Sequence, residues 1–156
     1  MAKARDIPGL TEASTFRQAA RLAVEVRADE VFEHAAGVLD TRDIERVHAM
    51  RVATRRLRAV MEIYAPAFPK KQHRAALKEV KALADALGER RDRDVAIEAL
   101  TRIGAALTAD DRPGIEHLVT ELRDEQAGAN EELATALQQI EESDMRGRLR
   151  ALAATA

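Results

Sequence analysis

The chain contains no cysteine and no tryptophan, and aromatic residues make up only 3% of it. Without cysteine, a disulfide framework and a thiolate metal site are both excluded. Serine occurs only at Ser14 and Ser143, and the sequence contains no nucleophile elbow, glycine-rich phosphate loop or dinucleotide fingerprint. We therefore expect a protein that is not an enzyme and that has no cofactor and no metal site.

Long hydrophobic runs are also missing. No apolar stretch approaches the roughly 18 residues that a membrane-spanning helix needs, and the first residues lack the apolar core of a secretory signal. We therefore expect a cytoplasmic protein with no membrane partner. At 156 residues one domain with a sizeable core is expected.

The apolar residues recur with the 3.6-residue period of a helix, and the apolar set is dominated by alanine and leucine. Short connections favour antiparallel neighbours, so the sequence predicts an all-α antiparallel bundle of about five to six helices. The expected helices cover residues 15–39, 43–65 and 70–87, a segment from about 91 through 103, a segment from the cap at 108–111 to 142, and a short tail after 143. Residues 1–13 are expected to be a disordered or extended N-terminus, and residues 14–156 a single helical domain.

Helix ends are predicted from local signals. Ser14 or Thr11 is expected to cap the first helix, because short polar side chains accept from free backbone amides. Pro66 and Pro69 end the second helix, and Gly88 is placed as the C-terminal stop of the third.

Charge is distributed unevenly along the chain. Residues 42–93 hold 14 Lys/Arg and 7 Asp/Glu, whereas residues 94–144 hold 3 basic and 13 acidic residues, although the whole chain carries only −2. A basic centre followed by an acidic segment indicates one face for an anion and another for solvent or self-association.

The most informative stretch is a row of cations in the second helix. His48, Arg51, Arg55 and Arg58 fall within an arc of about 80°, and Met50, Leu57, Val60, Met61 and Tyr64 occupy the opposite side. Arginine donates two parallel hydrogen bonds to phosphate oxygens and stays charged. The row therefore indicates a ligand that carries several negative charges.

Two further groups of basic residues follow. Lys70, Lys71, Arg74, Lys78 and Lys81 lie within an arc of about 100° on the third helix, which is also the pattern of an ordinary solvated face. Arg90, Arg91 and Arg93 flank the expected start of the fourth helix, where free backbone amides suit phosphate. An ordinary charged helix start explains this second group equally well.

Two other interpretations use the same residues. Glu45 and His48 fit one half of a di-metal Glu-x-x-His pair, but the second pair is missing. Hydrolysis of phosphate chains would need carboxylates that hold a metal beside the basic rows, with Asp85, Asp92 and Asp94 as candidates.

Residues 47–58, Val-His-Ala-Met-Arg-Val-Ala-Thr-Arg-Arg-Leu-Arg, strongly resemble the signature of the CHAD family of conserved-histidine α-helical domains. Residues 83–88 and 91–95 resemble the second motif of that family. The resemblance implies an all-helical fold that binds inorganic polyphosphate on a basic surface without catalysis. The ligand contacts that it implies are His48, Arg51, Arg55, Arg56, Arg58, Lys78, Lys81, Arg91 and Arg93, to which the basic rows add Arg74 and Arg90.

Members of the family are typically about twice this long, with two similar helical halves that face a shared groove, and this chain resembles the first half. We hypothesise that two copies associate as a homodimer, so that the second copy supplies the facing wall. Association with polyphosphate granules is a further expectation. A helical nucleic-acid-binding protein that uses the same basic surface is the alternative, although single-strand binders usually offer aromatic stacking platforms.

Overall fold

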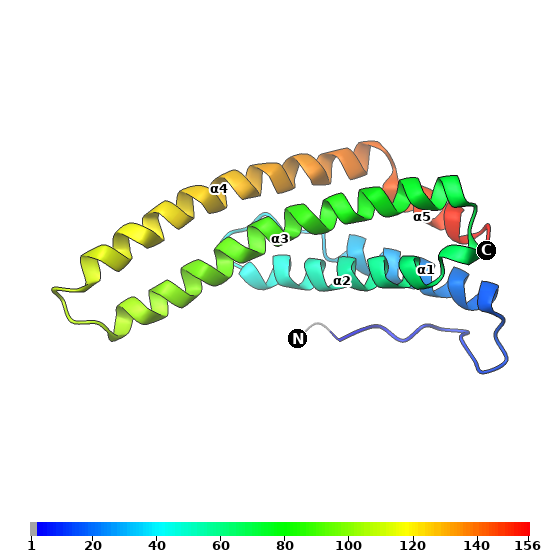
Figure 1. The fold of residues 1–156 in the computed structure, drawn as a ribbon, viewed down its shortest axis with the longest axis horizontal. Helices are drawn as coiled ribbons and strands as arrows, with labels where there is room; N and C mark the ends of the chain where they lie inside the picture. The colour runs from blue at the N-terminus through cyan, green and yellow to red at the C-terminus, as the bar shows by residue number, and fades with distance from the viewer. Residues whose placement is uncertain (1–2) are drawn as a thin grey trace.

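The computed structural model describes residues 3–156, which form five α-helices and one short 3-10 helix (Figure 1). The helices are α1 (Phe16–Glu33), α2 (Ile44–Ile63), η1 (Ala65–Ala67), α3 (Lys70–Ala106), α4 (Arg112–Glu142) and α5 (Met145–Ala153). The prediction of an all-α bundle is confirmed. None of the helices in this part of the chain is apolar over a length that would cross a membrane.

The first helix is shorter than predicted. It begins after Thr15, whose hydroxyl accepts from the Gln18 amide at 3.2 Å while the Gln18 side chain accepts from the Thr15 amide at 2.9 Å. This capping box satisfies both free amides, so neither Ser14 nor Thr11 is the cap. α1 ends at Glu33 rather than at residue 39, and the turns that follow include Gly37 with a φ of +72°. A left-handed backbone conformation of this kind favours glycine.

The third and fourth predicted helices are one continuous helix, α3, of 37 residues. Gly88 lies inside it and does not end it, so the predicted helix start near Arg91 is wrong. A glycine costs a helix interior only about 1 kcal/mol, and Leu87, Arg90 and Asp94 around it are buried. Packing on these side chains outweighs the local propensity of glycine.

The core occupies one end of the molecule. α1, α2, the first half of α3, the second half of α4 and α5 contribute its buried side chains, which include Val24, Met50, Leu57, Leu87 and Leu133. By contrast, residues 95–125 contain no buried side chain. This segment, the last part of α3 and the first part of α4, forms a two-helix arm that extends beyond α1 and α2 (Figure 1).

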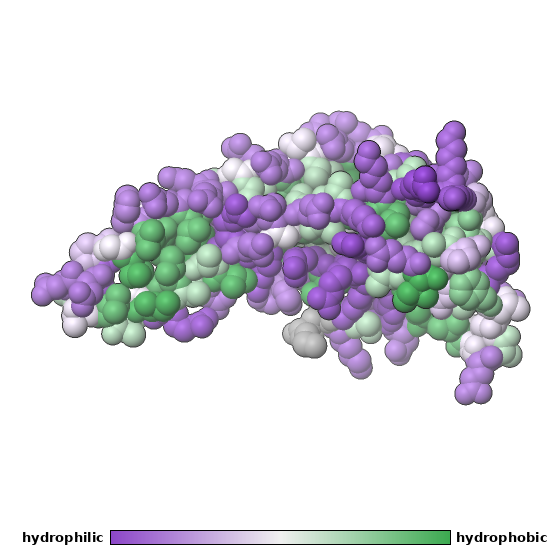
Figure 2. Space-filling model, in the orientation of Figure 1, coloured by the Kyte–Doolittle hydropathy of each residue, from purple (hydrophilic) through white to green (hydrophobic). Residues whose placement is uncertain are grey.

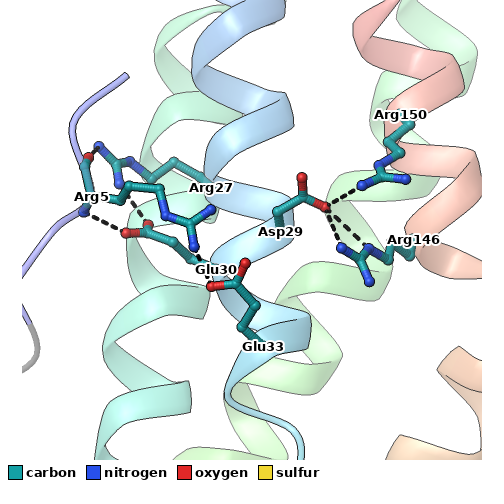
Figure 3. A network of polar contacts seen from close by, with 7 residues as sticks. All are labelled: Arg5, Arg27, Asp29, Glu30, Glu33, Arg146 and Arg150. Carbon is teal, nitrogen blue, oxygen red and sulfur yellow. Dashed lines mark hydrogen bonds and ion pairs between the residues drawn. The ribbon is translucent and has the colours of Figure 1, made fainter. Parts of the chain in front are cut away.

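Polar contacts tie both ends of the chain to α1 (Figure 3). The Arg5 amide donates to Glu30 Oε1 at 2.6 Å, and Arg27 donates to the Arg5 carbonyl at 2.8 Å. On another side of α1, Asp29 accepts from Arg146 at 2.9 Å and from Arg150 at 2.8 Å. The segment before α1 and the last helix are thus both held against α1.

Candidate anion-binding surface

α2 presents the cationic row on the side that faces away from the core. Its opposite side is anchored by Met50, Leu57 and Met61, each at most 1% exposed. Arg55 is exposed, and His48 and Arg51 are partly exposed. Since the buried side fixes the rotation of the helix about its axis, the row is held at the surface.

The row borders a shallow groove between α2 and α3, with a cavity volume of about 320 Å³. From α2 the groove is lined by Arg51, Arg55 and Arg58, and from α3 by Ala84, Asp85, Gly88, Glu89 and Asp92. One wall is therefore basic, and the facing wall carries three carboxylates. The sequence predicted a groove lined by basic residues, and the carboxylates of the α3 wall were not part of that prediction.

Most arginines of the chain are held by carboxylates or carbonyl groups, but a few cations of α2 and α3 are not. Within residues 3–156, the side chains of Arg51, Arg55, Arg74 and Lys78 form no hydrogen bond or ion pair, and the same holds for the side chain of His48. Arg74 and Lys78 are exposed on α3. Unpaired charges at the surface remain available to an external anion.

Arg58 and Lys81 join the two helices through a shared carboxylate. Glu62 Oε1 lies 3.1 Å from Arg58 Nε and 3.2 Å from Lys81 Nζ. Hydrogen bonds from Arg58 and then Lys81 lower the pKa of Glu62. The carboxylate therefore stays ionised at neutral pH and neutralises part of the charge of the row.

The structure removes Arg90 from the predicted site. This side chain is 0% exposed, and its guanidinium donates to Asp94 at 3.0 Å and to the side chain of Asn130. The side chain of Gln126 also donates to Asp94, at 2.6 Å. The prediction failed because Arg90 and Asp94 lie four residues apart in one continuous helix, on the side that meets α4.

Arg91 and Arg93 are also engaged within the protein. Arg91 donates to the Ile44 carbonyl at 3.2 Å and lies 3.6 Å from Glu45, with its side chain 14% exposed. Arg93 pairs with Glu89 and lies 3.4 Å from Glu125. These two residues hold α3 against the start of α2 and against α4, so no free helix N-terminus offers them to a phosphate.

Arg56 acts on the α1 side of α2. Burial on α1 acts to raise the pKa of Glu30. Hydrogen bonds from Arg27 and from the Arg5 amide, together with the charges of Arg27 and Arg56, outweigh burial, so the pKa of Glu30 is lowered. Arg56 is therefore separated from the groove residues, which lie on the α3 side of the same helix.

The described part of the chain contains no group of three or more His, Asp or Glu residues that could hold a metal ion. Glu45 and His48 have no matching pair, and Asp94 is buried against Arg90. The surface can contact an anion through guanidinium and ammonium groups.

Comparison with known proteins decides the family. The family model of the CHAD domain matches residues 22–156. The chain belongs to the CHAD family. CHAD domains are associated with polyphosphate binding in general. No curated protein and no solved structure matches the chain.

The two sequence motifs of this CHAD domain occupy different environments. The first, residues 47–58, forms the middle of α2 and supplies the exposed row. The second lies within α3, where Leu83, Leu87, Arg90 and Asp94 are buried. The second motif thus packs α3 against its neighbours, and its buried members are not exposed at the surface.

Sequence reasoning named Asp85 and Asp92 as carboxylates beside the basic rows, but only as metal-holding candidates, and it did not predict that they and Glu89 form one wall of the groove. Asp85, Glu89 and Asp92 continue the same side of α3 as Lys78 and Lys81, since each step of three or four residues returns to that side. The spacing was visible in the sequence. The continuous wall was missed because Gly88 was taken as the end of a helix.

Proposed function

We propose that this CHAD domain binds inorganic polyphosphate, without catalysis, on the surface formed by α2 and the first part of α3. The unpaired state of Arg51, Arg55, Arg74 and Lys78 is the observation that carries the proposal. Each exposed cation without an internal partner loses little by contacting a phosphate oxygen, whereas a paired arginine must first give up its carboxylate.

The order of the cations suits a linear polyanion. From Arg51 to Arg58 the axis of α2 advances by about 10 Å. Because α3 runs antiparallel to α2, the step from Lys81 back to Arg74 continues in the same direction for about another 10 Å. Glu62 marks the crossing point, where Arg58 and Lys81 meet. The cations thus form a track about 20 Å long, on which several consecutive phosphates are contacted at once.

The carboxylates of α3 limit the direction of this track. Asp85, Glu89 and Asp92 face the arginine row across the groove and repel a polyanion. The bound chain therefore follows α2 and then turns towards Lys78 and Arg74, away from Asp92. In this proposal the contacts are His48, Arg51, Arg55, Arg58, Arg74, Lys78 and Lys81.

The aromatic residues argue for polyphosphate over single-stranded nucleic acid. None of the groove residues is aromatic, and the rings of Phe16 and Tyr64 contact each other, with centroids 5.1 Å apart. Proteins that bind single strands usually stack bases on aromatic side chains. We place the activity in the cytoplasm, including at polyphosphate granules.

The test compares the Arg51→Ala/Arg55→Ala double variant with the unchanged protein in titrations with long-chain polyphosphate at several salt concentrations. We expect binding at least about tenfold weaker, because two charge-assisted contacts are lost. The slope of log affinity against log salt should also fall by about 1.4, since about 0.7 counterions are released per phosphate contact on a single strand.

The control is the double variant Arg21→Ala/Arg102→Ala, which removes two positive charges from exposed arginines that pair with Glu25 and Glu98. Its affinity for polyphosphate should be nearly unchanged. An equal loss in this control, or in Glu131→Ala on α4, would show that the assigned surface is wrong. Equal competition by duplex DNA or RNA would favour the nucleic-acid alternative, and phosphate release with magnesium would contradict a non-catalytic role.

A further inference from the structure

The arm at residues 95–125 has an apolar side that no element of residues 3–156 covers. Val95 is 47% exposed, Ile103 50% and Leu118 45%. At about 100° per residue, Val95 and Ile103 share one side of α3, and Figure 2 shows an apolar area on the arm, bordered by hydrophilic residues. Soluble proteins rarely expose a contiguous apolar area without a partner for it.

On α4, carboxylates share the side of Leu118. Glu121 and Glu125 follow Leu118 at steps of three and seven residues, which return to the same side of a helix. Their side chains are 59% and 57% exposed. His117 and Arg93 approach these two carboxylates only to 3.4 Å. Both carboxylates therefore remain accessible to a cationic partner beside the apolar area.

On α3, the side of Ile103 continues into the acidic wall of the groove. Alternating steps of four and three residues lead from Ile103 through Ala99 and Ala96 to Asp92. Asp92 lines the groove opposite the arginine row, and its side chain forms no ion pair within residues 3–156. The apolar area is thus bordered by negative charge at its base as well as along α4.

The charge of the arm as a whole is also negative. Residues 95–125 contain seven acidic and three basic residues, and none of the basic residues is a lysine. Of the three arginines, Arg112 and Arg123 line a groove on the other side of the arm, and Arg102 pairs with Glu98 at 3.2 Å. Within the arm, the ionised groups that share the side of Leu118 are therefore carboxylates.

We propose that the apolar side of the arm binds a cationic amphipathic helix of another protein. The apolar residues of that helix pack between Ile103 and Leu118. Its lysines or arginines lie beside Glu121 and Glu125 along α4 and beside Asp92 at the base. An amphipathic helix on an apolar face is a recurrent mode of recognition, and the carboxylates make a cationic helix the complementary partner. A second copy of the arm carries the same negative charge and lacks this complementarity.

The dimensions of the arm suit a helix of about four turns. The helical parts of the arm, residues 95–106 and 112–125, are about 20 Å long, which a helix of about 13 residues spans. Two neighbouring helices leave a shallow groove between their ridges, and a third helix of about 10 Å diameter fits along it. Because the buried area is small, we expect the micromolar affinity of a transient complex. The carboxylates repel anionic lipid, nucleic acid and polyphosphate from this side.

The test titrates the chain, without polyphosphate, into a fluorescent synthetic peptide of about 14 residues. The peptide carries leucine along one side of the helix and lysine at the other positions, and fluorescence anisotropy measures binding. We expect a dissociation constant of about 1–50 µM at low salt. A scrambled peptide of the same composition, and a peptide with glutamate in place of lysine, should each bind at least about tenfold more weakly, because each keeps only one of the two features.

Variants of the arm locate the site. Ile103→Lys/Leu118→Lys should bind the leucine–lysine peptide at least about tenfold more weakly, with unchanged helical circular dichroism, because it replaces apolar contacts by like charge. Glu121→Gln/Glu125→Gln should weaken binding by about threefold to tenfold and reduce its salt dependence.

Two matched controls should bind the peptide as the unchanged chain does. Glu116→Gln/Asp124→Asn removes the same charge from other sides of α4, since Glu116 lines the groove on the other side of the arm. Ile63→Lys replaces an apolar residue that is 65% exposed at the end of α2, outside the arm.

No saturable binding of the leucine–lysine peptide, equal binding of either altered peptide, or an equal loss in either control would each overturn the proposal. Sedimentation that shows a dimer, lost in Ile103→Lys/Leu118→Lys, would also overturn it, because a second copy would then cover the apolar side. The result is separable from polyphosphate binding. Ile103→Lys/Leu118→Lys should bind polyphosphate at least as tightly as the unchanged chain does, and Arg51→Ala/Arg55→Ala should still bind the peptide.

Discussion

Arg51 and Arg55 differ from most arginines of this protein in what surrounds them. Most other exposed arginines pair with a nearby carboxylate, as Arg21 does with Glu25 and Arg148 with Glu79, although Arg123 on the arm does not. The carboxylates that line the groove opposite Arg51 and Arg55 lie on α3 and form no ion pair with them. At the scale of single residues, the property that suits this surface to an anion is therefore the absence of internal partners.

Glu62 provides a prediction at the same scale. Glu62→Gln removes the carboxylate that holds Arg58 and Lys81, so it frees two cations and deletes one negative charge beside the track. We expect polyphosphate to bind about two- to fivefold more tightly at neutral pH and low salt, since exposed ion pairs are weak and screened. The measurement is a titration with long-chain polyphosphate.

Glu131→Gln, at an exposed position of α4, is the control for the change in net charge. If both variants bind equally tightly, only the overall charge matters, and the track through Arg58 and Lys81 is not the binding path.

Among the helices, α3 shows how packing overrides a local signal. Gly88 resembles a helix stop, but Leu87 is buried beside it, and Arg90 and Asp94 are buried one and two turns further on. Continuing the helix places the carboxylates of Asp85, Glu89 and Asp92 beside the basic row and carries α3 into the arm. The predicted anion site at a new helix start disappears for the same reason.

The substitution Gly88→Ala tests this continuity. A Cβ at Gly88 meets no other atom within 4 Å, and alanine favours the helix, so we expect the free energy of unfolding to rise by about 0.5–1 kcal/mol. Chemical denaturation measures the change. Gly104→Ala in the same helix is the control, because its Cβ would lie 3.1 Å from Ile115 Cγ2, and it should gain less or lose stability.

A loss of stability in Gly88→Ala would contradict the continuous helix, since a glycine that ends a helix in a left-handed conformation does not accept a Cβ without strain.

At the scale of the whole molecule, one largely buried polar network lies at the base of the arm, just before and after residues 95–125. Arg90 and Asp94 on α3 contact Asn130 and Gln126 on α4, and Asn130 donates to the Leu39 carbonyl before α2 at 3.1 Å. Arg90 Nη2 and Asp94 Oδ2 are buried without a partner among the described residues. The remaining contacts must therefore be kept, because each further loss would leave a buried charge uncompensated.

Arg90→Ala should consequently lower the free energy of unfolding by about 3–5 kcal/mol, since it leaves Asp94 charged and buried. Denaturant unfolding followed by circular dichroism measures this loss. Arg21→Ala, which breaks an exposed pair with Glu25, should change stability by at most about 0.5 kcal/mol. A loss below about 1 kcal/mol in Arg90→Ala would show that the network contributes little to the fold.

The sequence by itself determined the helical class, the end of α2 before Pro66, and the rotation of α2 that places Arg51 and Arg55 at the surface. These features depend on local periodicity and on side chains within one helix, which the sequence contains directly. Only the tertiary structure decided which cations stay free. Arg90 is buried because α4 covers it, Arg91 is held by the start of α2, and Glu62 accepts from both α2 and α3, so their roles depend on neighbours that are distant in sequence.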